Sequence, residues 1–544
     1  THDYPSLGQV RQRMYNHNDW DYEDLLGRVA VPTIAHEIGQ WPTHPVWAEN
    51  RKYQGNLKAW NLGLLEQLAK QKGVHQLDTK FQLASGKRAV LLYKDEIESY
   101  LRTPSAAGFQ LLGMQDYTGQ GEALIGWLDA FYDEKGITTP FDFRQFCNDV
   151  VPLVRLNTYS WKEGQAMNVP VLLYQYAAES ITGNIRWNLK DEHGSILVSG
   201  SLGQKVFESG RLHQVGNMEA VIPMGLANTQ ITLHVWVEGT GYENNWPLWV
   251  FPCENSRIDS EDVFITREFD DHTRAVLAAG RKVLLIANNL GAMENGALAS
   301  WKPLYWSATF FPGQGIKTIG SLIQHDHPLF DHFPTSDHSD WQWWNIAAGG
   351  RGSPLNNFPA AYVPIVMPIS DFHFSDRIGS IFEVTAGGGR LLVCGYDISE
   401  DNHSVEAKQL RYSILKYMES DCFNPEVNIG LSQLGELFQR SGNQREASVP
   451  ANALLSVLPS PKKNGPSVYL KSMDQVLIGD TSSYELYNVS YWKDEHAAGW
   501  RGKNIRLVVK VPPGLLGDLK VVVREVGNEC SIKIENRHYP LLPT

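Results

Sequence analysis

Cysteines and basic tracts are scarce in this sequence, and each shortage excludes a class of protein. The five cysteines lie far apart without a CxxC pair, so neither a zinc site nor a dense disulfide framework is indicated. Their odd number leaves at least one free thiol. The formal net charge is -12 and no basic tract offsets it locally, which argues against nucleic acid or an anionic membrane as a partner.

Long apolar runs and nucleotide-binding motifs are also absent. There is no apolar run of about 18 residues and no signal-peptide pattern, so we expect a soluble chain without a membrane span, either a mature form or a fragment. The glycine triplet 387–389 lacks GxGxxG spacing and precedes an expected strand instead of a helix. It is therefore no phosphate-binding loop, and we expect no cofactor.

The composition is that of a globular protein with a slight excess of aromatic residues. The 544 residues exceed what one hydrophobic core holds and predict about three or four domains. Aromatic residues make up 11% of the chain. Such an excess suits stacking on sugar rings, although large β-sandwiches also use Trp and Tyr in their cores.

The stretch 29–41, VAVPTIAHEIGQW, is the strongest candidate for an active site. An apolar, β-branched run ends at His36 and Glu37 and is followed by Gly39 and Trp41. This pattern is typical of a buried parallel strand that delivers a carboxylate to its C-terminal end, which is the active face of a βα barrel. A sugar-cleaving site needs a carboxylate, a polar orienting partner and an aromatic face. The alternative is that Glu37 is an exposed carboxylate in a strand-to-helix loop.

A second strand follows after a long helical region. Apolar residues recur at helical spacing over 57–72 and 75–101, and the apolar run 108–113 then ends in Gln115, Asp116 and Tyr117. Two strands joined by a helical crossover predict one βαβ unit whose polar loops share an edge. Asp116 has the alternative interpretation of an Asx turn before a glycine.

The remainder of the chain predicts three further domains. Short alternating strands with Gly, Asn and Pro turns over 151–256 indicate an immunoglobulin-like β-sandwich. Continuous apolar strands and amphipathic helices over 257–425 indicate an open parallel sheet of flavodoxin or glutamine-amidotransferase type. A linker and a β-rich tail over 426–544 have too few strands for a whole jelly roll.

A loop rich in His and Asp, residues 325–340, is the second candidate site. His and Asp are metal ligands, but they are also ordinary turn and cap residues, and the prolines here leave the ligand geometry undefined. We expect this loop to bind no metal and the 257–425 domain to be structural. Amidotransferase chemistry is not expected, because no Cys-His-Glu set lies at a nucleophile elbow.

The motifs resemble one family. The segment VPTIAHEIGQW, with WDYEDLLGR before it and NRKYQGNLKAWN after it, is similar to the seventh strand and following helix of the TIM (β/α)8 barrel in glycoside hydrolase family 2, in its gut and marine bacterial members. The run 108–113 resembles the eighth strand, so residues 1–150 would be the end of the barrel. The segment NNWPLWVFP resembles the end of the family's β-sandwich, and the tail resembles its galactose-binding-like domain.

The resemblance implies roles for particular residues. Glu37 would be the nucleophile of a retaining mechanism. The implied substrate-binding residues around it are His36, Gln40, Trp41, Gln115, Asp116 and Tyr117. In this family the acid/base residue ends the fourth strand, after an Asn, and only 36 residues precede Glu37 here, so we expect that partner to be absent from this chain.

The implied function is a retaining, exo-acting glycoside hydrolase that removes a terminal β-linked sugar, with β-galactosidase preferred over β-glucuronidase and β-mannosidase. Two βα units cannot close an eight-stranded barrel, so about six units would come from an upstream segment or a partner chain. A non-catalytic carbohydrate-binding or scaffold protein with a degenerate barrel is the alternative. The expected partners are a carbohydrate, the remaining barrel half and a second copy in a homo-oligomer, and the expected location is periplasmic or secreted.

Overall fold

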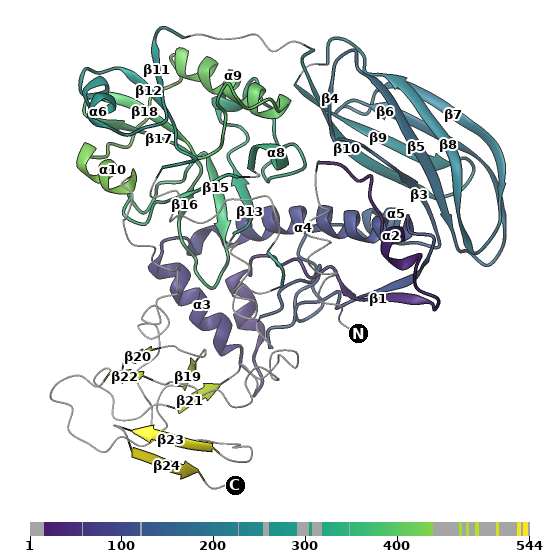
Figure 1. Cartoon of the computed structure of the whole chain (residues 1–544), viewed down its shortest axis with the longest axis horizontal. Coiled ribbons are helices and arrows are strands. Elements are labelled where there is room, and N and C mark those ends of the chain that lie inside the picture. The colour runs from purple at the N-terminus through teal and green to yellow at the C-terminus, as the bar shows by residue number, and fades with distance from the viewer. Residues whose placement is uncertain are drawn as a thin grey trace. The chain divides into compact units, whose positions relative to one another are not determined.

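The computed structural model describes residues 16–438 apart from short gaps, together with six strands farther on. The gaps are residues 57, 120–121, 227, 254–259, 291–303, 307–317 and 348. The chain divides into two compact units, Thr1–Gln444 and Arg445–Thr544. The architecture of the first unit combines helices with several β-sheets (Figure 1).

The segment that carries Glu37 forms a parallel βαβ unit. Strand β1 (Thr33–Ile38) pairs in parallel with β2 (Ala106–Leu111), and helices α3 (Trp60–Gln71) and α4 (Asp78–Leu101) connect them. The prediction of two parallel strands joined by a helical crossover is confirmed. The smaller elements nearby are α2 (Glu23–Leu26), η1 (Trp47–Lys52), η2 (His75–Leu77) and α5 (Pro140–Phe146).

The two-stranded sheet and the residues that flank it leave apolar side chains in solvent. Val31 is 66% exposed, Ile34 is 63% exposed and Met114 is 45% exposed. Both edges of the β1–β2 pair are open, and the described part of the chain forms no closed barrel. The structure therefore shows a βαβ unit of the kind expected at the end of a TIM barrel, and it does not show the barrel itself.

Eight strands form two antiparallel sheets that pack as a sandwich. One sheet has the order β4-β10-β9-β6-β7, with a parallel pair between β4 and β10, and the other has the order β3-β5-β8. Buried and half-buried residues alternate along β9, as expected for a strand with one face in a core. The strands are β3 (Val150–Val154), β4 (Ser160–Lys162), β5 (Ala166–Gln175), β6 (Ile181–Lys190), β7 (Ile196–Phe207), β8 (Arg211–Val221), β9 (Thr229–Val237) and β10 (Glu243–Phe251).

A six-stranded sheet with the order β11-β12-β18-β17-β15-β13 follows the sandwich in sequence. Its strands alternate between two cores: Leu284 and Leu392 face the core that contains α9, whereas Val283 and Leu391 face the core that contains α10. The strands are β11 (Val263–Thr266), β12 (Lys282–Ile286), β13 (Thr318–Ile323), β15 (Val366–Ser370), β17 (Ile381–Ala386) and β18 (Gly389–Cys394). The other elements are β14 (Ser353–Pro354), β16 (Ile378–Gly379), α6 (Asp271–Ala278), η4 (Pro328–Phe330), α8 (Trp343–Ala347), α9 (Val405–Glu419) and α10 (Leu431–Phe438).

The prediction of an open parallel sheet over 257–425 is confirmed for three of its strands only. Strands β11, β12 and β18 are parallel, but β17 is antiparallel to both β18 and β15, and β15 is antiparallel to β13. The turn between β17 and β18 explains the antiparallel pairing of these two strands. Gly387 and Gly388 have φ values of +61° and +97°, and Ala386 pairs directly with Gly389. A two-residue turn with positive φ joins antiparallel strands, so the glycine triplet makes a hairpin.

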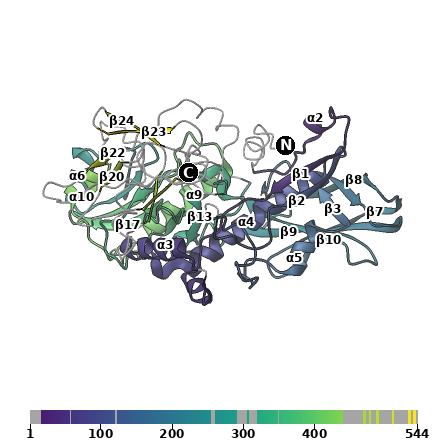
Figure 2. The ribbon, with the colours of Figure 1, turned by 90° about the horizontal axis from the view of Figure 1, so that it is seen from below.

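Helix α4 connects these parts of the first unit. It contacts β2 of the βαβ unit and β13 of the six-stranded sheet. Figures 1 and 2 show its C-terminal half beside β3 and β10 of the sandwich, and Glu98 in that half bonds to β10. The helix has 24 residues, most of them buried. Among the residues that the structure describes, no helix combines the length and apolarity needed to cross a membrane.

The second unit is described only as three pairs of short strands. β19 (Ser467–Leu470) pairs in parallel with β21 (Glu485–Asn488), and β20 (Gln475–Leu477) pairs in parallel with β22 (Val508–Lys510). β23 (Cys530–Ile534) and β24 (Arg537–Leu541) are antiparallel. Most of the region for which a galactose-binding-like jelly roll is predicted lies outside the described residues.

Candidate active site

Glu37 lies at the C-terminal end of β1 in an unusual backbone conformation. Its φ is +55°, in the left-handed region that side chains other than glycine rarely adopt. The Glu37 side chain is 31% exposed, and His36 Nε2 lies 3.3 Å from its Oε1. Gln40 Nε2 donates to the Glu37 carbonyl at 2.7 Å and lies 3.4 Å from Oε2. The structure thus brings His36 and Gln40 to Glu37 and leaves its carboxylate partly open.

A residue of β2 also takes part in this arrangement. Nδ1 of His36 lies 3.1 Å from Oε1 of Gln110. Since an amide oxygen only accepts hydrogen bonds, Nδ1 of His36 carries the proton in this contact. Gln110 was not predicted from the sequence. Its position in the parallel strand next to His36 is the signal that could have identified it.

Helix α4 fixes the loop after Glu37. Glu96 Oε2 accepts hydrogen bonds from the Gly39 backbone N–H at 2.9 Å and from Trp41 Nε1–H at 3.0 Å. Gly39 has a φ of +73°, and a Cβ at this position would lie 2.0 Å from Cε1 of Tyr93. Trp41 is only 3% exposed. The ring that was predicted to face a sugar is therefore packed in the core, and a role for Trp41 in substrate binding stays a prediction.

The loop also contacts a short segment next to the six-stranded sheet, residues 304–306. The Trp306 backbone N–H donates to the Gln40 carbonyl at 2.8 Å, and the ring of Tyr305 meets the ring of Trp41 edge-on at 6.4 Å. Burial raises the pKa of Tyr305, and the carboxylates of Glu96 and Glu37 raise it further. Sequence reasoning missed these two aromatic residues, because no local pattern relates them to β1.

The loop after β2 holds Asp116 in a buried ion pair. Lys135 Nζ lies 2.6 Å from Asp116 Oδ1, and each side chain is only 2% exposed. The Gly126 backbone N–H donates to the same oxygen at 2.8 Å. Burial raises the pKa of Asp116, although Lys135 opposes the rise. Lys135 also donates to Thr43 Oγ1 at 2.8 Å, so it ties this loop to the loop that follows β1.

The two neighbours of Asp116 differ in exposure. Tyr117 is 57% exposed, and its backbone N–H donates to the Ala123 carbonyl at 2.9 Å. Gln115 is half-buried and forms a bridge with Leu128. The structure thus places Tyr117 within reach of a ligand and Asp116 within the fold, and the substrate-binding roles of all three residues stay predictions.

The His and Asp residues of the loop 325–340 are spread over separate contacts. His338 Nδ1 lies 2.7 Å from Asp337 Oδ1, whereas the buried Asp340 accepts from Trp249 Nε1 at 2.9 Å. Burial raises the pKa of Asp340 to about 6. Within the described ranges, no group of three His, Cys, Asp or Glu side chains is arranged to hold a metal ion.

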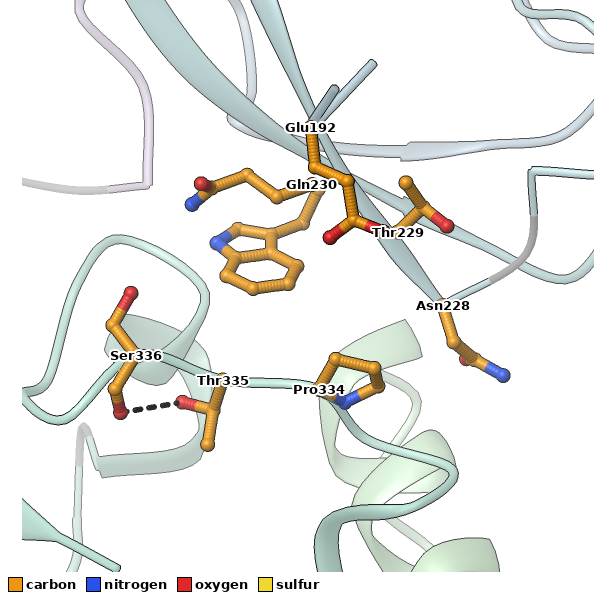
Figure 3. A pocket seen from close by; sticks show the side chains of 8 residues that line it. Glu192, Asn228, Thr229, Gln230, Pro334, Thr335 and Ser336 are labelled. Atoms are coloured by element: carbon orange, nitrogen blue, oxygen red, sulfur yellow. Dashed lines mark hydrogen bonds between the residues drawn. The ribbon is translucent and has the colours of Figure 1, made fainter. Parts of the chain in front are cut away.

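A pocket between the sandwich and the 334–336 loop contains none of the predicted site residues. Figure 3 shows Glu192, Gln230 and the 334–336 segment around it. Trp249 also lines the pocket, but it is 5% exposed and offers little ring surface for stacking. The pocket lining is Glu192, Asn228, Thr229, Gln230, Trp249, Pro334, Thr335 and Ser336.

Comparison with known proteins identifies domains without an assigned role. A family model described as a domain of unknown function (DUF8487) matches residues 264–439, and another (DUF8488) matches residues 165–252. No curated protein matches the chain.

Solved structures share only distant similarity with parts of the chain. An exo-chitosanase, CsxA of Amycolatopsis orientalis, is 13% identical over 32% of this chain and 19% of its own, with a TM-score of 0.20. A β-glucuronidase of Bacteroides uniformis is 11% identical over 32% of this chain and 20% of its own, with a TM-score of 0.15. The sporulation control protein Spo0M of Bacillus subtilis is 10% identical over 19% of this chain and 50% of its own, with a TM-score of 0.15. The chain spans no more than half the length of these structures, and its similarity to glycoside hydrolases is distant and partial.

Proposed function

We propose that the chain is the C-terminal part of a retaining glycoside hydrolase in which Glu37 is the nucleophile. The observation that carries the proposal is the position of Glu37, at the C-terminal end of a parallel strand, partly exposed, with φ of +55° and with His36 and Gln40 at its carboxylate. Strained backbone positions are found where function requires a fixed side-chain direction. The family resemblance of the surrounding motif assigns the same residue to the same role.

In the proposed reaction, the Glu37 carboxylate attacks the anomeric carbon and displaces the leaving oxygen. A second carboxyl group, about 5 to 5.5 Å away, protonates that oxygen and then activates the water that hydrolyses the glycosyl-enzyme. Gln40 Nε2 orients Glu37 through its carbonyl and its Oε2. His36 is held by Gln110 and lies beside Oε1, where it restricts the rotation of the carboxylate.

The second carboxyl group is proposed to come from the remaining barrel half, on an upstream segment or a partner chain. The exposed Val31, Ile34 and Met114 and the open edges of the β1–β2 pair are the surfaces that further barrel strands would cover. We further propose a terminal β-galactoside as substrate, in preference to a β-glucuronide or β-mannoside. A periplasmic or secreted location and a homo-oligomer complete the proposal.

The test is Glu37→Gln in the complete protein, with its remaining barrel strands, assayed on aryl β-galactoside, β-glucuronide and β-mannoside. The amide keeps the shape but cannot act as the nucleophile, so turnover should fall by at least about 1000-fold with the fold unchanged. Glu219→Gln, on an exposed face of β8, is the matched control and should keep full activity. A 2-deoxy-2-fluoro glycoside should label Glu37, as read by peptide mass spectrometry.

A non-catalytic carbohydrate-binding protein is the competing proposal. In that case the complete protein would bind sugars without hydrolysing any of the three aryl glycosides. Labelling at another carboxylate, or a Glu37→Gln variant that keeps most of its rate, would remove Glu37 from the mechanism.

A further inference from the structure

Glu37 needs support from its surroundings to keep its conformation. A left-handed φ in a residue with a side chain is unfavourable and persists only where neighbouring contacts impose it. Four hydrogen bonds act on the five residues from Glu37 to Trp41. Gln40 Nε2–H donates to the Glu37 carbonyl, Glu96 accepts from Gly39 and Trp41, and Trp306 donates to the Gln40 carbonyl.

Glu96 is the only one of these partners that bridges two residues of the loop. Both of its hydrogen bonds reach the same oxygen, Oε2, one from the backbone of Gly39 and one from the indole of Trp41. Gly39 itself is pressed against Tyr93, one turn earlier on the same helix, and has no room for a side chain. Helix α4 therefore fixes the loop from two adjacent turns, through the ring of Tyr93 and the carboxyl group of Glu96.

The geometry assigns Glu96 as a positioning residue that holds the Gly39–Trp41 loop and, through it, the direction of the Glu37 carboxylate. This assignment rests on the proposed nucleophilic role of Glu37. Glu96 is 4% exposed and its hydrogen bonds end in the loop, so it acts through Gly39 and Trp41 and not on the sugar. Without it, two donors next to the nucleophile lose their acceptor.

The protonation state of Glu96 makes its contact with the loop measurable. Burial raises the pKa of Glu96 to about 8, against the lowering effect of the Gly39 and Trp41 hydrogen bonds, and Asp95 raises it further. Both protonation states keep an oxygen for the two donors, but only the ionised state places a negative charge beside the indole of Trp41. The titratable groups that interact with Glu96 are Asp95, Tyr93 and Tyr100 on α4, Tyr22 before β1 and Tyr305 of the 304–306 segment.

Two variants of Glu96 in the complete protein separate positioning from general stability. Glu96→Gln keeps an oxygen acceptor and should retain kcat near neutral pH. Glu96→Ala removes the acceptor, so kcat should fall on the order of 100-fold with KM little changed, because misplacement of a reacting group by about 1 Å costs that much. Asp95→Asn is the matched control, since Asp95 accepts from Trp20 and not from the loop.

A spectroscopic measurement makes the test independent of turnover. In protein labelled with 5-fluorotryptophan, the ¹⁹F resonance of Trp41, assigned with Trp41→Phe, should move between about pH 6 and about pH 9 as Glu96 ionises. Glu96→Gln should abolish that movement, whereas Asp95→Asn should shift the Trp20 resonance and keep the movement of Trp41, with its midpoint at a lower pH because Asp95 raises the pKa of Glu96. The assignment is overturned if Trp41 titrates identically in the wild type and Glu96→Gln. This spectroscopic test does not require Glu96→Ala to fold. It is also independent of turnover, so a failure of Glu37→Gln to reduce turnover would count against the proposed function and leave the spectroscopic result unaffected.

Discussion

His373 joins the loop after β2 to the six-stranded sheet through two carboxylates, and its replacement should weaken the fold in a pH-dependent way. Its Nδ1 lies 2.6 Å from Asp371 Oδ1 and its Nε2 lies 2.8 Å from Glu122 Oε2. The side chains of His373 and Asp371 are 10% and 0% exposed. Burial lowers the pKa of His373, but the two carboxylates outweigh burial and raise it from 6.5 to about 10.

The size of the stability change follows from the difference between the raised and the ordinary pKa of His373. A pKa of about 10 against the ordinary 6.5 corresponds to at most about 5 kcal/mol of preference for the protonated, folded state. Removal of one member of a buried ion pair typically costs about 3–5 kcal/mol, because the remaining charges are left without a partner. We therefore expect His373→Gln to lower the free energy of unfolding by about 3–5 kcal/mol near pH 6.

The sign of the pH dependence is fixed by the raised pKa. The contribution of His373 is fully present below the pKa of the unfolded chain, near 6.5, and it is lost as the pH rises through about 10. Urea unfolding of wild type and His373→Gln at several pH values up to about 11 should therefore show a difference that shrinks as the solution becomes alkaline. The exposed His403→Gln is the control and should behave like the wild type throughout. A His373→Gln deficit that stays constant across this range would refute the ion-pair account.

Two further predictions concern the βαβ unit. Gly39→Ala should lower the free energy of unfolding in urea by at least about 2 kcal/mol, since alanine must adopt φ of +73° and overlap Tyr93. Gly63→Ala in α3, where a Cβ would meet nothing within 4 Å, is the control and should not destabilise the protein. Equal stability of the two variants would contradict this prediction. Residues 1–544 expressed without further barrel strands should hydrolyse no aryl glycoside, and the amides of β1 and β2 should show fast hydrogen exchange. Hydrolysis that depends on Glu37 would show that no further strands are needed.

The features that sequence predicted well are those fixed by local pattern. The apolar run that ends at Glu37 predicted β1, and the helical spacing of apolar residues predicted the crossover and hence the parallel pairing with β2. The same pattern could not distinguish parallel from antiparallel strands in the six-stranded sheet. Apolar runs look alike in parallel and antiparallel strands, and only the two-residue turn at Gly387 and Gly388 determined the direction of β17 relative to β18.

Contacts between distant segments were not predictable. Asp95, Glu96 and Glu98 stand in the run YKDEIESY, a composition that usually marks a solvent-exposed helix face. In the fold each is at most 4% exposed. Trp41 was predicted to face a sugar, yet its indole N–H reaches one of these carboxylates. Such burial depends on which segments pack against the helix, and a period of 3.6 residues carries no information about that.

The buried acids of α4 also explain how the sandwich supports a site to which it contributes no predicted residue. Glu98 accepts from Trp246 Nε1 at 3.0 Å and from Asn244 Nδ2 at 2.9 Å, both on β10, and pairs with Arg102 on its own helix. Two residues earlier, Glu96 holds the loop after Glu37. One helix thus fixes the sandwich and the proposed nucleophile at neighbouring positions, with a buried carboxyl group at both contacts. Because buried polar groups that lose their partners are costly, the helix cannot slide or rotate without breaking both sets of bonds. The sandwich therefore serves the proposed site by keeping α4, and with it the direction of Glu37, in one place.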